Sequence, residues 1–233
     1  MTDVAATPVF VRARLRRDSS TAALARLLIP ESAGARLGAA HSLVWALFAD
    51  EPDRSRDFLW REMRPGEFLI LSLRPPADPH GLFDLECKPF APALRSGQQL
   101  RFDLRANPVI AVAEKPGERG KRRDIVMHAI YDVAHEERAA ARETAIRELG
   151  TAWLARKGET AGFGVAPDRL YIDDYDQVHI PREGTRSIVF STLTFHGVLT
   201  VHDPARFLTS IAKGFGAAKA FGCGLMLIGP AYL

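Results

Sequence analysis

The sequence has 233 residues, of which 47% are hydrophobic and 25% are charged, a composition typical of a folded globular protein and not of a disordered chain. The formal net charge is only +3, yet 25 of the 31 lysines and arginines are arginine, the side chain best suited to two-pronged binding of phosphate. A genome that favours arginine codons gives the same bias, so the composition permits a nucleic-acid partner without demonstrating one.

The cysteines and the chain start exclude several other classes of protein. Cys87 and Cys223 are far apart and form no C-x-x-C pair, so neither a zinc cluster nor a disulfide framework is indicated. The N-terminus lacks the basic start and apolar block of a signal peptide, and no run approaches the roughly 18 apolar residues of a membrane helix. We therefore expect a soluble cytoplasmic protein with no metal, no cofactor and no membrane contact.

One ferredoxin-like unit is predicted in the first half of the chain. Apolar residues alternate with arginines over residues 9–15, which indicates a half-buried strand. A helical stripe of apolar residues covers residues 37–50, with His41 and Trp45 on its flank. Further strands are expected at residues 58–62, 67–73 and 100–105. This order predicts a ferredoxin-like domain (βαββαβ) over residues 1–113 whose second helix is short or degenerate.

The second half, residues 114–233, predicts another ferredoxin-like unit with an insertion. A Gly-rich basic segment, EKPGERGKRR, and the apolar run after it suggest a protruding β-hairpin with a charged tip. A helical section follows at residues 132–157, and residues 158–186 read as loop-rich. A long strand or hairpin at 189–201, a helix capped by Asp203 and Pro204, a glycine loop and a final strand at 223–228 complete the unit. The expected fold is α+β, with two tandem ferredoxin-like (RRM-like) domains and a protruding basic β-hairpin.

The glycine loop, residues 213–225, follows a helix and leads into a strand. A dinucleotide-binding fingerprint or a P-loop needs the opposite order, so those ligands are excluded. Two readings remain. The loop lets bare backbone approach a phosphodiester chain, or it is a helix C-cap followed by a tight turn. The first reading makes these residues RNA contacts: Lys213, Gly214, Gly216, Lys219, Gly222 and Gly224.

Three stretches together resemble a known family. The tail FHGVLTVHDPARFLTSIAKGFGAAKAFGCGLMLIGP, the helix segment HSLVWALFAD with the nearby RDFLWRE, and LRFDLRANPV followed by KRRD are similar to CasE-type endoribonucleases of the subtype I-E CRISPR system. The resemblance covers residues 9–230. The tail and LRANP are specific signals, and the helix motif is moderately specific.

The resemblance implies an activity and a set of partners. It implies a protein that binds the stem-loop of a CRISPR repeat transcript as a monomer and cuts it without metal at the 3′ base of the stem, where the 2′-hydroxyl attacks the adjacent phosphate. It also implies retention of the cut RNA within the multisubunit surveillance complex. The family's catalytic histidine corresponds to His41. Histidine exchanges protons readily near neutral pH, although a histidine at the edge of a core helix often has no catalytic role.

One position departs from the family pattern. Several members have a tyrosine that assists catalysis three residues before the histidine, and Gly38 stands there instead. Either that role is dispensable, or another group performs it, such as Arg36, Ser42 or a lysine of the glycine loop.

Basic residues outside the glycine loop are further candidates for binding the RNA stem. Duplex RNA is recognised mostly through its shape, phosphates and 2′-hydroxyls, so a charged hairpin suits that role, although a solvated loop has the same composition. The candidates are Arg36, Arg105, Arg119, Lys121, Arg122, Arg123, Arg182 and Arg186.

Two other functions are compatible with this sequence. The first is a hairpin-binding subunit that does not cleave, as the glycine at position 38 suggests. The second is a small-molecule enzyme, because ferredoxin-like scaffolds host many activities.

Overall fold

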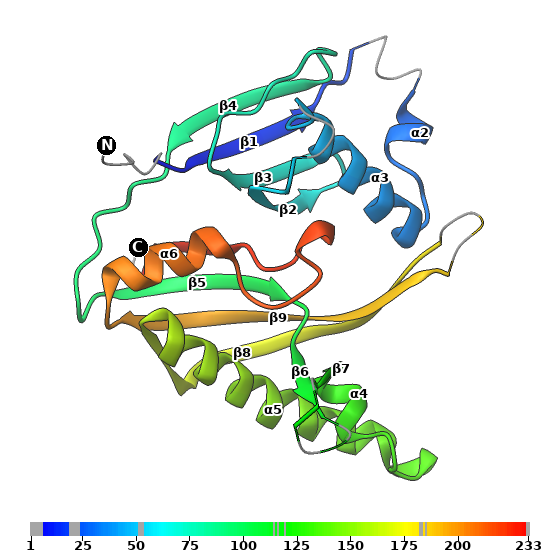
Figure 1. Ribbon diagram of the computed structural model, residues 1–233, viewed down its shortest axis with the longest axis vertical. Coiled ribbons are helices and arrows are strands. Elements are labelled where there is room, and N and C mark those ends of the chain that lie inside the picture. Colours follow the sequence, from blue (N-terminus) through cyan, green and yellow to red (C-terminus); the bar gives the residue numbers. More distant parts are fainter. Residues whose placement is uncertain are drawn as a thin grey trace.

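The computed structural model describes residues 7–18, 24–50, 54–113, 115, 117–118, 120–181, 184 and 186–231. These residues form two four-stranded antiparallel sheets and a separate two-stranded hairpin, and each large sheet carries its helices on one face (Figure 1). No helix within these ranges is both long enough and apolar enough to span a membrane.

The first sheet has the strand order of a ferredoxin-like unit. Its order is β2-β3-β1-β4, and helices α2 (Ala25–Leu28) and α3 (Ala33–Ala46) connect the first two strands. Residues 73–82, between the third and fourth strands, contain no helix, which confirms that the second helix of this unit is degenerate. The strands are β1 (Val9–Leu15), β2 (Phe58–Arg64), β3 (Glu67–Ser72) and β4 (Phe83–Pro89).

The second sheet repeats this topology. Its order is β10-β5-β9-β8, with α5 (Arg138–Ala161) between its first two strands in sequence and α6 (Pro204–Lys213) between its last two. Two sheets with the same strand order confirm the α+β class and the tandem ferredoxin-like architecture. The strands are β5 (Gln99–Ala106), β8 (Phe163–Ile180), β9 (Ile188–Val201) and β10 (Met226–Pro230).

Strand β5 corrects one prediction. We assigned this strand to the first unit, but it pairs with β9 and β10 in the second sheet, so the chain changes sheets between Pro89 and Gln99. Leu100, Phe102 and Leu104 are buried in the second core. Their alternation shows that one face of the strand is buried, but it does not show which sheet the strand joins.

One further prediction of local structure is wrong, and the predicted basic hairpin is present but does not include the apolar run. Residues 163–180 are not loop-rich, since they form β8. Most of its side chains are exposed or half-buried, so the strand lacks apolar alternation and is held by its pairing with β9. The basic hairpin consists of β6 (Val109–Val112) and β7 (Lys121–Asp124), and the apolar run after it is helix α4 (Ile125–Ala129). The Asp124 carboxylate caps that helix by accepting from the backbone N–H of Met127.

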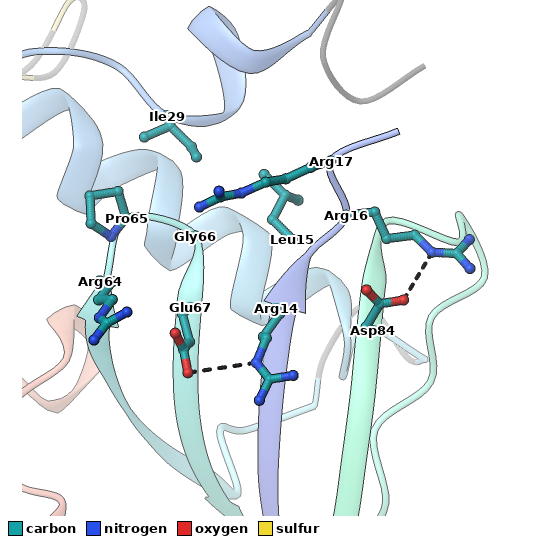
Figure 2. A pocket seen from close by; sticks show the side chains of 10 residues that line it. All are labelled: Arg14, Leu15, Arg16, Arg17, Ile29, Arg64, Pro65, Gly66, Glu67 and Asp84. Carbon is teal, nitrogen blue, oxygen red and sulfur yellow. Dashed lines mark hydrogen bonds and ion pairs between the residues drawn. The ribbon is translucent and has the colours of Figure 1, made fainter. Parts of the chain in front are cut away.

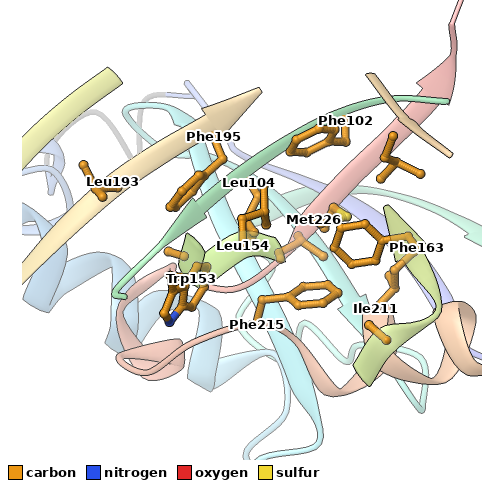
Figure 3. Close-up of a cluster of buried hydrophobic side chains, with 14 of the residues drawn as sticks. Phe102, Leu104, Trp153, Leu154, Phe163, Leu193, Phe195, Ile211, Phe215 and Met226 are labelled. Carbon is orange, nitrogen blue, oxygen red and sulfur yellow. The ribbon is translucent and has the colours of Figure 1, made fainter. Parts of the chain in front are cut away.

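Side chains from both units pack into the larger hydrophobic core. Leu59 of β2 and Leu71 of β3 belong to the larger core, which is otherwise built from the second unit and includes Trp153, Phe195 and Phe215 (Figure 3). Helix α3 lies against the far end of β8, so closely that a Cβ on Gly34 would stand 2.0 Å from the carbonyl oxygen of His179. Contacts with the second unit therefore fix the helix that carries His41.

Candidate functional site

His41 lies on the flank of α3, between the face of the helix that packs in the core and the face that is exposed to solvent. Ala40 and Val44 on the same helix are buried, while His41 is half-buried. Its Nδ1 donates to the carbonyl oxygen of Ala220 at 2.8 Å. The indole Nε1 of Trp60 donates to the same oxygen at 3.1 Å. One carbonyl of the short 3₁₀ helix η2 (Lys219–Phe221) thus holds the imidazole.

This hydrogen bond fixes the tautomer of His41. A carbonyl oxygen only accepts, so Nδ1 must carry a hydrogen. In the neutral ring Nε2 therefore presents a lone pair, and in the protonated ring it presents an N–H. Nε2 is the atom left to exchange a proton with a bound molecule, which is the arrangement that general acid or base catalysis by histidine requires.

The imidazole borders a surface pocket of about 460 Å³ between the two units. Aromatic rings lie beside it, with ring-centroid distances of 5.1 Å to Phe221 and 6.2 Å to Trp45. Two cations, Arg56 and Lys219, also border the pocket, and no carboxylate is among the described residues that line it. The lining consists of His41, Trp45, Arg56, Ala218, Lys219, Ala220 and Phe221.

Lys219 is surrounded by other positive charges. Its Nζ donates to the carbonyl oxygen of Lys213 at 2.7 Å. Burial lowers the pKa of Lys219, and the nearby charges of Arg56, Lys157 and Arg122 lower it further. Lys157 and Lys213 line an adjoining pocket that also contains Lys219. Because the described residues that line the two pockets include cations and no acid, this part of the surface suits a polyanion.

Arg56 is a site residue that our sequence reasoning missed. It lies just ahead of β2, is half-buried, and burial lowers its pKa. Within the part of the chain that the structure describes, Arg56 has neither a hydrogen bond nor an ion pair. The adjacent carboxylate of Asp57 accepts instead from Arg74 at 2.6 Å. Arg56 is within the segment RDFLWRE, but nothing in the sequence distinguishes it as a site residue from the other arginines, of which the chain has 25 in all.

The glycine loop is folded tightly against the protein. Gly214, Gly216, Gly222 and Gly224 all have φ between 74° and 91°, which strongly favours glycine. A Cβ at Gly216 would lie 2.8 Å from the carbonyl oxygen of Asn107, and one at Gly224 would lie 2.6 Å from that of Phe215. These contacts are with protein backbone, which favours the tight-turn reading of the loop. Direct RNA contact by the glycines remains a prediction.

The LRANP motif anchors this loop. The Ala217 N–H donates to the carbonyl oxygen of Asn107 at 3.1 Å, and the Gly224 N–H donates to that of Arg105 at 2.7 Å. Asn107 is itself buried, and its side chain donates to the carbonyl oxygen of Ser191 on β9 at 2.7 Å. The two most specific sequence motifs are therefore in contact, and together they place Ala220 beside His41.

The basic hairpin reaches the same surface. Lys121, Arg122 and Arg123 are exposed on β7, and the charge of Arg122 is close enough to Lys219 to lower the pKa of that lysine. Arg186 is exposed just ahead of β9. Arg119 and Arg182, also expected to bind RNA, lie outside the described residues.

Other predicted residues are engaged away from the imidazole. Burial raises the pKa of Glu62, while a hydrogen bond from the Gly66 N–H and the charges of Arg36 and Arg105 lower it, so both arginines act on that carboxylate. Ser42 Oγ donates to the carbonyl oxygen of Gly38 at 3.3 Å. Of the substitutes considered for the family tyrosine, only Lys219 lines the His41 pocket.

A larger pocket of about 690 Å³ lies at the β2–β3 turn (Figure 2). Its arginines are partly neutralised, because Arg14 forms ion pairs with Glu67 and Glu86, and Arg16 pairs with Asp84 at 3.2 Å. The described residues that line it include no histidine. We therefore place the candidate site at the smaller pocket, on chemistry and not on size.

Fold and site together define a tandem ferredoxin-like protein with a fixed histidine in a positively charged surface pocket. The chain belongs to the family described as CRISPR associated protein, whose model matches residues 10–230. The resemblance stated from the sequence is thereby confirmed.

Named relatives agree with this assignment. The chain is 32% identical over 152 residues to the CRISPR-associated endoribonuclease Cse3 of Thermus thermophilus, an alignment that spans 61% of each protein. It is 26% identical over 212 residues to the CRISPR system Cascade subunit CasE of Escherichia coli, covering 89% of this chain and 98% of that subunit.

Solved structures show the same fold. Thermus thermophilus Cse3 bound to an RNA representing a pre-cleavage complex superposes with a TM-score of 0.66 at 26% identity, over 96% of this chain and all of that one. The crystal structure of Cas6e from Escherichia coli gives a TM-score of 0.53 at 20% identity, over 95% and 99% of the two chains. The second match supports the fold alone.

Proposed function

We propose that this protein is an endoribonuclease that binds the stem-loop of CRISPR repeat RNA and cleaves it at the 3′ base of the stem without a metal ion. The observation that carries the proposal is the Ala220 carbonyl, which holds Nδ1 of His41 and so makes Nε2 the proton-exchanging atom of an imidazole that borders a pocket lined by cations. A relative named as a CRISPR-associated endoribonuclease, Cse3 of Thermus thermophilus, supports it, and that protein has been solved with an RNA representing a pre-cleavage complex.

The chemistry is an internal transfer of the phosphoryl group. The 2′-oxygen attacks the adjacent phosphorus and forms a P–O2′ bond, and the P–O5′ bond breaks. The electron pair of that bond leaves on O5′, which takes a proton from Nε2 of protonated His41. The 2′-hydroxyl proton passes to solvent, so the products are a 2′,3′-cyclic phosphate and a 5′-hydroxyl, with no water consumed. General acid help of this kind is worth about 10² to 10⁴ in rate.

The surrounding surface binds the rest of the hairpin. Lys213 and Lys219 with the glycine loop lie beside the scissile phosphate, and Arg122 with Arg123 on β7 contacts the stem through its phosphates. The protein acts as a monomer on the RNA and keeps the cut product. In this proposal it joins the type I-E surveillance complex, as the name of the related Cascade subunit suggests.

A second candidate function is a hairpin-binding subunit that does not cleave. The observation that favours it is Gly38, which offers no functional group where several family members have a tyrosine. Lys219 and Arg56 in the pocket weaken this alternative, because cations beside a fixed imidazole serve cleavage as well as binding.

One experiment separates the two functions. A labelled RNA hairpin from the host's CRISPR repeat, with a single-stranded 3′ tail, is incubated with excess protein in EDTA. We expect cleavage at the 3′ base of the stem to a 5′-hydroxyl fragment and a cyclic phosphate, with the product still bound on a native gel. A 2′-deoxy substitution before the scissile phosphate must abolish cleavage and preserve binding. Intact but shifted RNA in the all-ribose reaction would establish the non-cleaving alternative.

A further inference from the structure

The segment before β2 contains an arginine whose described charged neighbours pair with other residues. Arg54 pairs with Asp50 at 2.9 Å, and Asp57 accepts from Arg74 at 2.6 Å. Arg56, between them, lines the His41 pocket and has no hydrogen bond or ion pair to any described residue. Asp50 and Asp57, the described carboxylates of this segment, are thus engaged by other arginines, and the guanidinium at the pocket has no anionic partner among the described residues.

An unneutralised arginine in this position is unfavourable in the free protein. Removing a cation from water costs free energy unless a partner compensates for it, and burial lowers the pKa of Arg56. Arg56 and Lys219 also repel one another, since the charge of Arg56 contributes to the lowered pKa of that lysine. An anion bound between them would remove both penalties. The pocket therefore has the electrostatics of a preorganised anion site.

The anion that fits is a phosphodiester. A planar guanidinium binds two phosphate oxygens at once, and the imidazole at the same pocket supplies the proton that a departing ribose oxygen needs. A carboxylate ligand would engage the cations but would leave His41 with no reaction to assist. The shared pocket therefore places Arg56 at the phosphate on which His41 acts.

We propose that Arg56 is a second catalytic residue of this site, binding one non-bridging oxygen of the scissile phosphate and stabilising the negative charge that develops there as the 2′-oxygen attacks. This inference rests on the proposed endoribonuclease function. It also explains how the site works with glycine at position 38. Gly38 has no side chain, so this position of α3 supplies no second group and the segment before β2 supplies it instead.

Phosphorothioate substrates test this contact directly. The hairpin is prepared with sulfur replacing either the pro-R or the pro-S oxygen of the scissile phosphate, and single-turnover cleavage is measured. We expect the wild-type protein to cleave one diastereomer more slowly than the other, because guanidinium binds sulfur poorly. Arg56→Ala should lower the rate on the all-oxygen substrate by about 10² to 10³, the usual cost of losing one donor to a developing oxyanion, and should remove the preference between diastereomers.

Controls separate catalysis from folding. Arg54→Ala, a nearby arginine that is paired with Asp50, should retain the wild-type rate and preference. Arg56→Lys keeps the positive charge but lacks the planar guanidinium with its paired N–H donors. We expect an intermediate rate with the diastereomer preference abolished. This variant still answers the question if Arg56→Ala does not fold. Affinity for the uncleavable 2′-deoxy hairpin should change by less than about tenfold in the Arg56 variants, since the interaction strengthens mainly in the transition state.

The outcomes distinguish the two proposals. If the wild-type protein cleaves and the Arg56 variants keep its rate or its diastereomer preference, Arg56 does not contact the phosphate and this inference fails alone. If the wild-type protein binds the all-oxygen hairpin without cutting it, the endoribonuclease function itself is wrong.

Discussion

His41 and His196 have similar aromatic surroundings, but of these two only His41 lies in a site suited to catalysis on RNA. His41 lies 5.1 Å from the ring of Phe221, and His196 lies 5.4 Å from the ring of Tyr171. Both are half-buried. Both also border pockets, of about 460 Å³ for His41 and about 670 Å³ for His196. Aromatic packing and pocket size therefore do not separate them.

Charge and orientation separate the two sites. His196 follows Phe195, which stacks on Trp153 of α5, so its side chain points away from the helices. Its Nε2 is 3.5 Å from a carboxylate oxygen of Asp173, and Asp103 also lines its pocket. Carboxylates repel phosphate, whereas the part of the His41 pocket that the structure describes is lined by two cations and no acid. The comparison shows that uncompensated charge around a fixed imidazole identifies the candidate site.

The largest expected difference between the two sites is in the cleavage rate. His41→Ala should lower single-turnover cleavage by about 10² to 10⁴, because the leaving oxygen loses its proton donor, while affinity for the uncleavable hairpin stays close to wild type. His196→Ala, the matched control, should cleave normally. Equal losses in both variants would show that pocket charge does not distinguish the two histidines, and full activity of His41→Ala would remove that residue from the chemistry.

RNA affinity should also distinguish the surface around the His41 pocket from the surface around His196. Arg122→Glu with Arg123→Glu on β7 should weaken hairpin affinity by roughly 10- to 100-fold and reduce the slope of log affinity against log salt by about two, one for each phosphate that is no longer neutralised. Arg101→Glu beside His196 provides the control and should change neither quantity. Titrations at several salt concentrations measure both. A slope unchanged by the double variant would place the hairpin outside the RNA interface.

The sequence predicted those parts of the site that depend on short-range patterns. His41 was identifiable because HSLVWALFAD resembles a family motif, and the glycine loop because four glycines occur in eleven residues. The fold class followed from two series of strands and helices. Such signals are local, and tertiary context did not override them.

What the sequence did not show depends on contacts between distant residues. Arg56 is distinguished only by the absence of a partner among the described residues, which is a property of the folded surface. Strand β5 alternates in the same way whichever sheet it joins, and β8 is stabilised by its pairing with β9 and not by an apolar pattern of its own. The close fit of Gly216 and Gly224 against backbone oxygens likewise became evident only once the loop was placed.

The smallest expected effect concerns proton uptake at Lys219. Burial and the nearby charges of Arg56, Lys157 and Arg122 lower its pKa, and a bound phosphate favours the ammonium form and raises the pKa again. RNA binding therefore takes up protons at alkaline pH, and affinity should fall as pH rises through the pKa of Lys219 in the free protein.

Lys219→Arg sharpens this prediction, because a guanidinium remains charged throughout that range. Affinity for the uncleavable hairpin, measured from about pH 7 to about pH 10, should fall a few-fold in the wild-type protein and much less in the variant. Lys213→Arg, the same change at an exposed neighbouring lysine, should keep the wild-type dependence. If Lys219→Arg also keeps the wild-type pH dependence, the loss of affinity at alkaline pH arises from another group. The crowding of cations around His41 then has no measurable effect on binding.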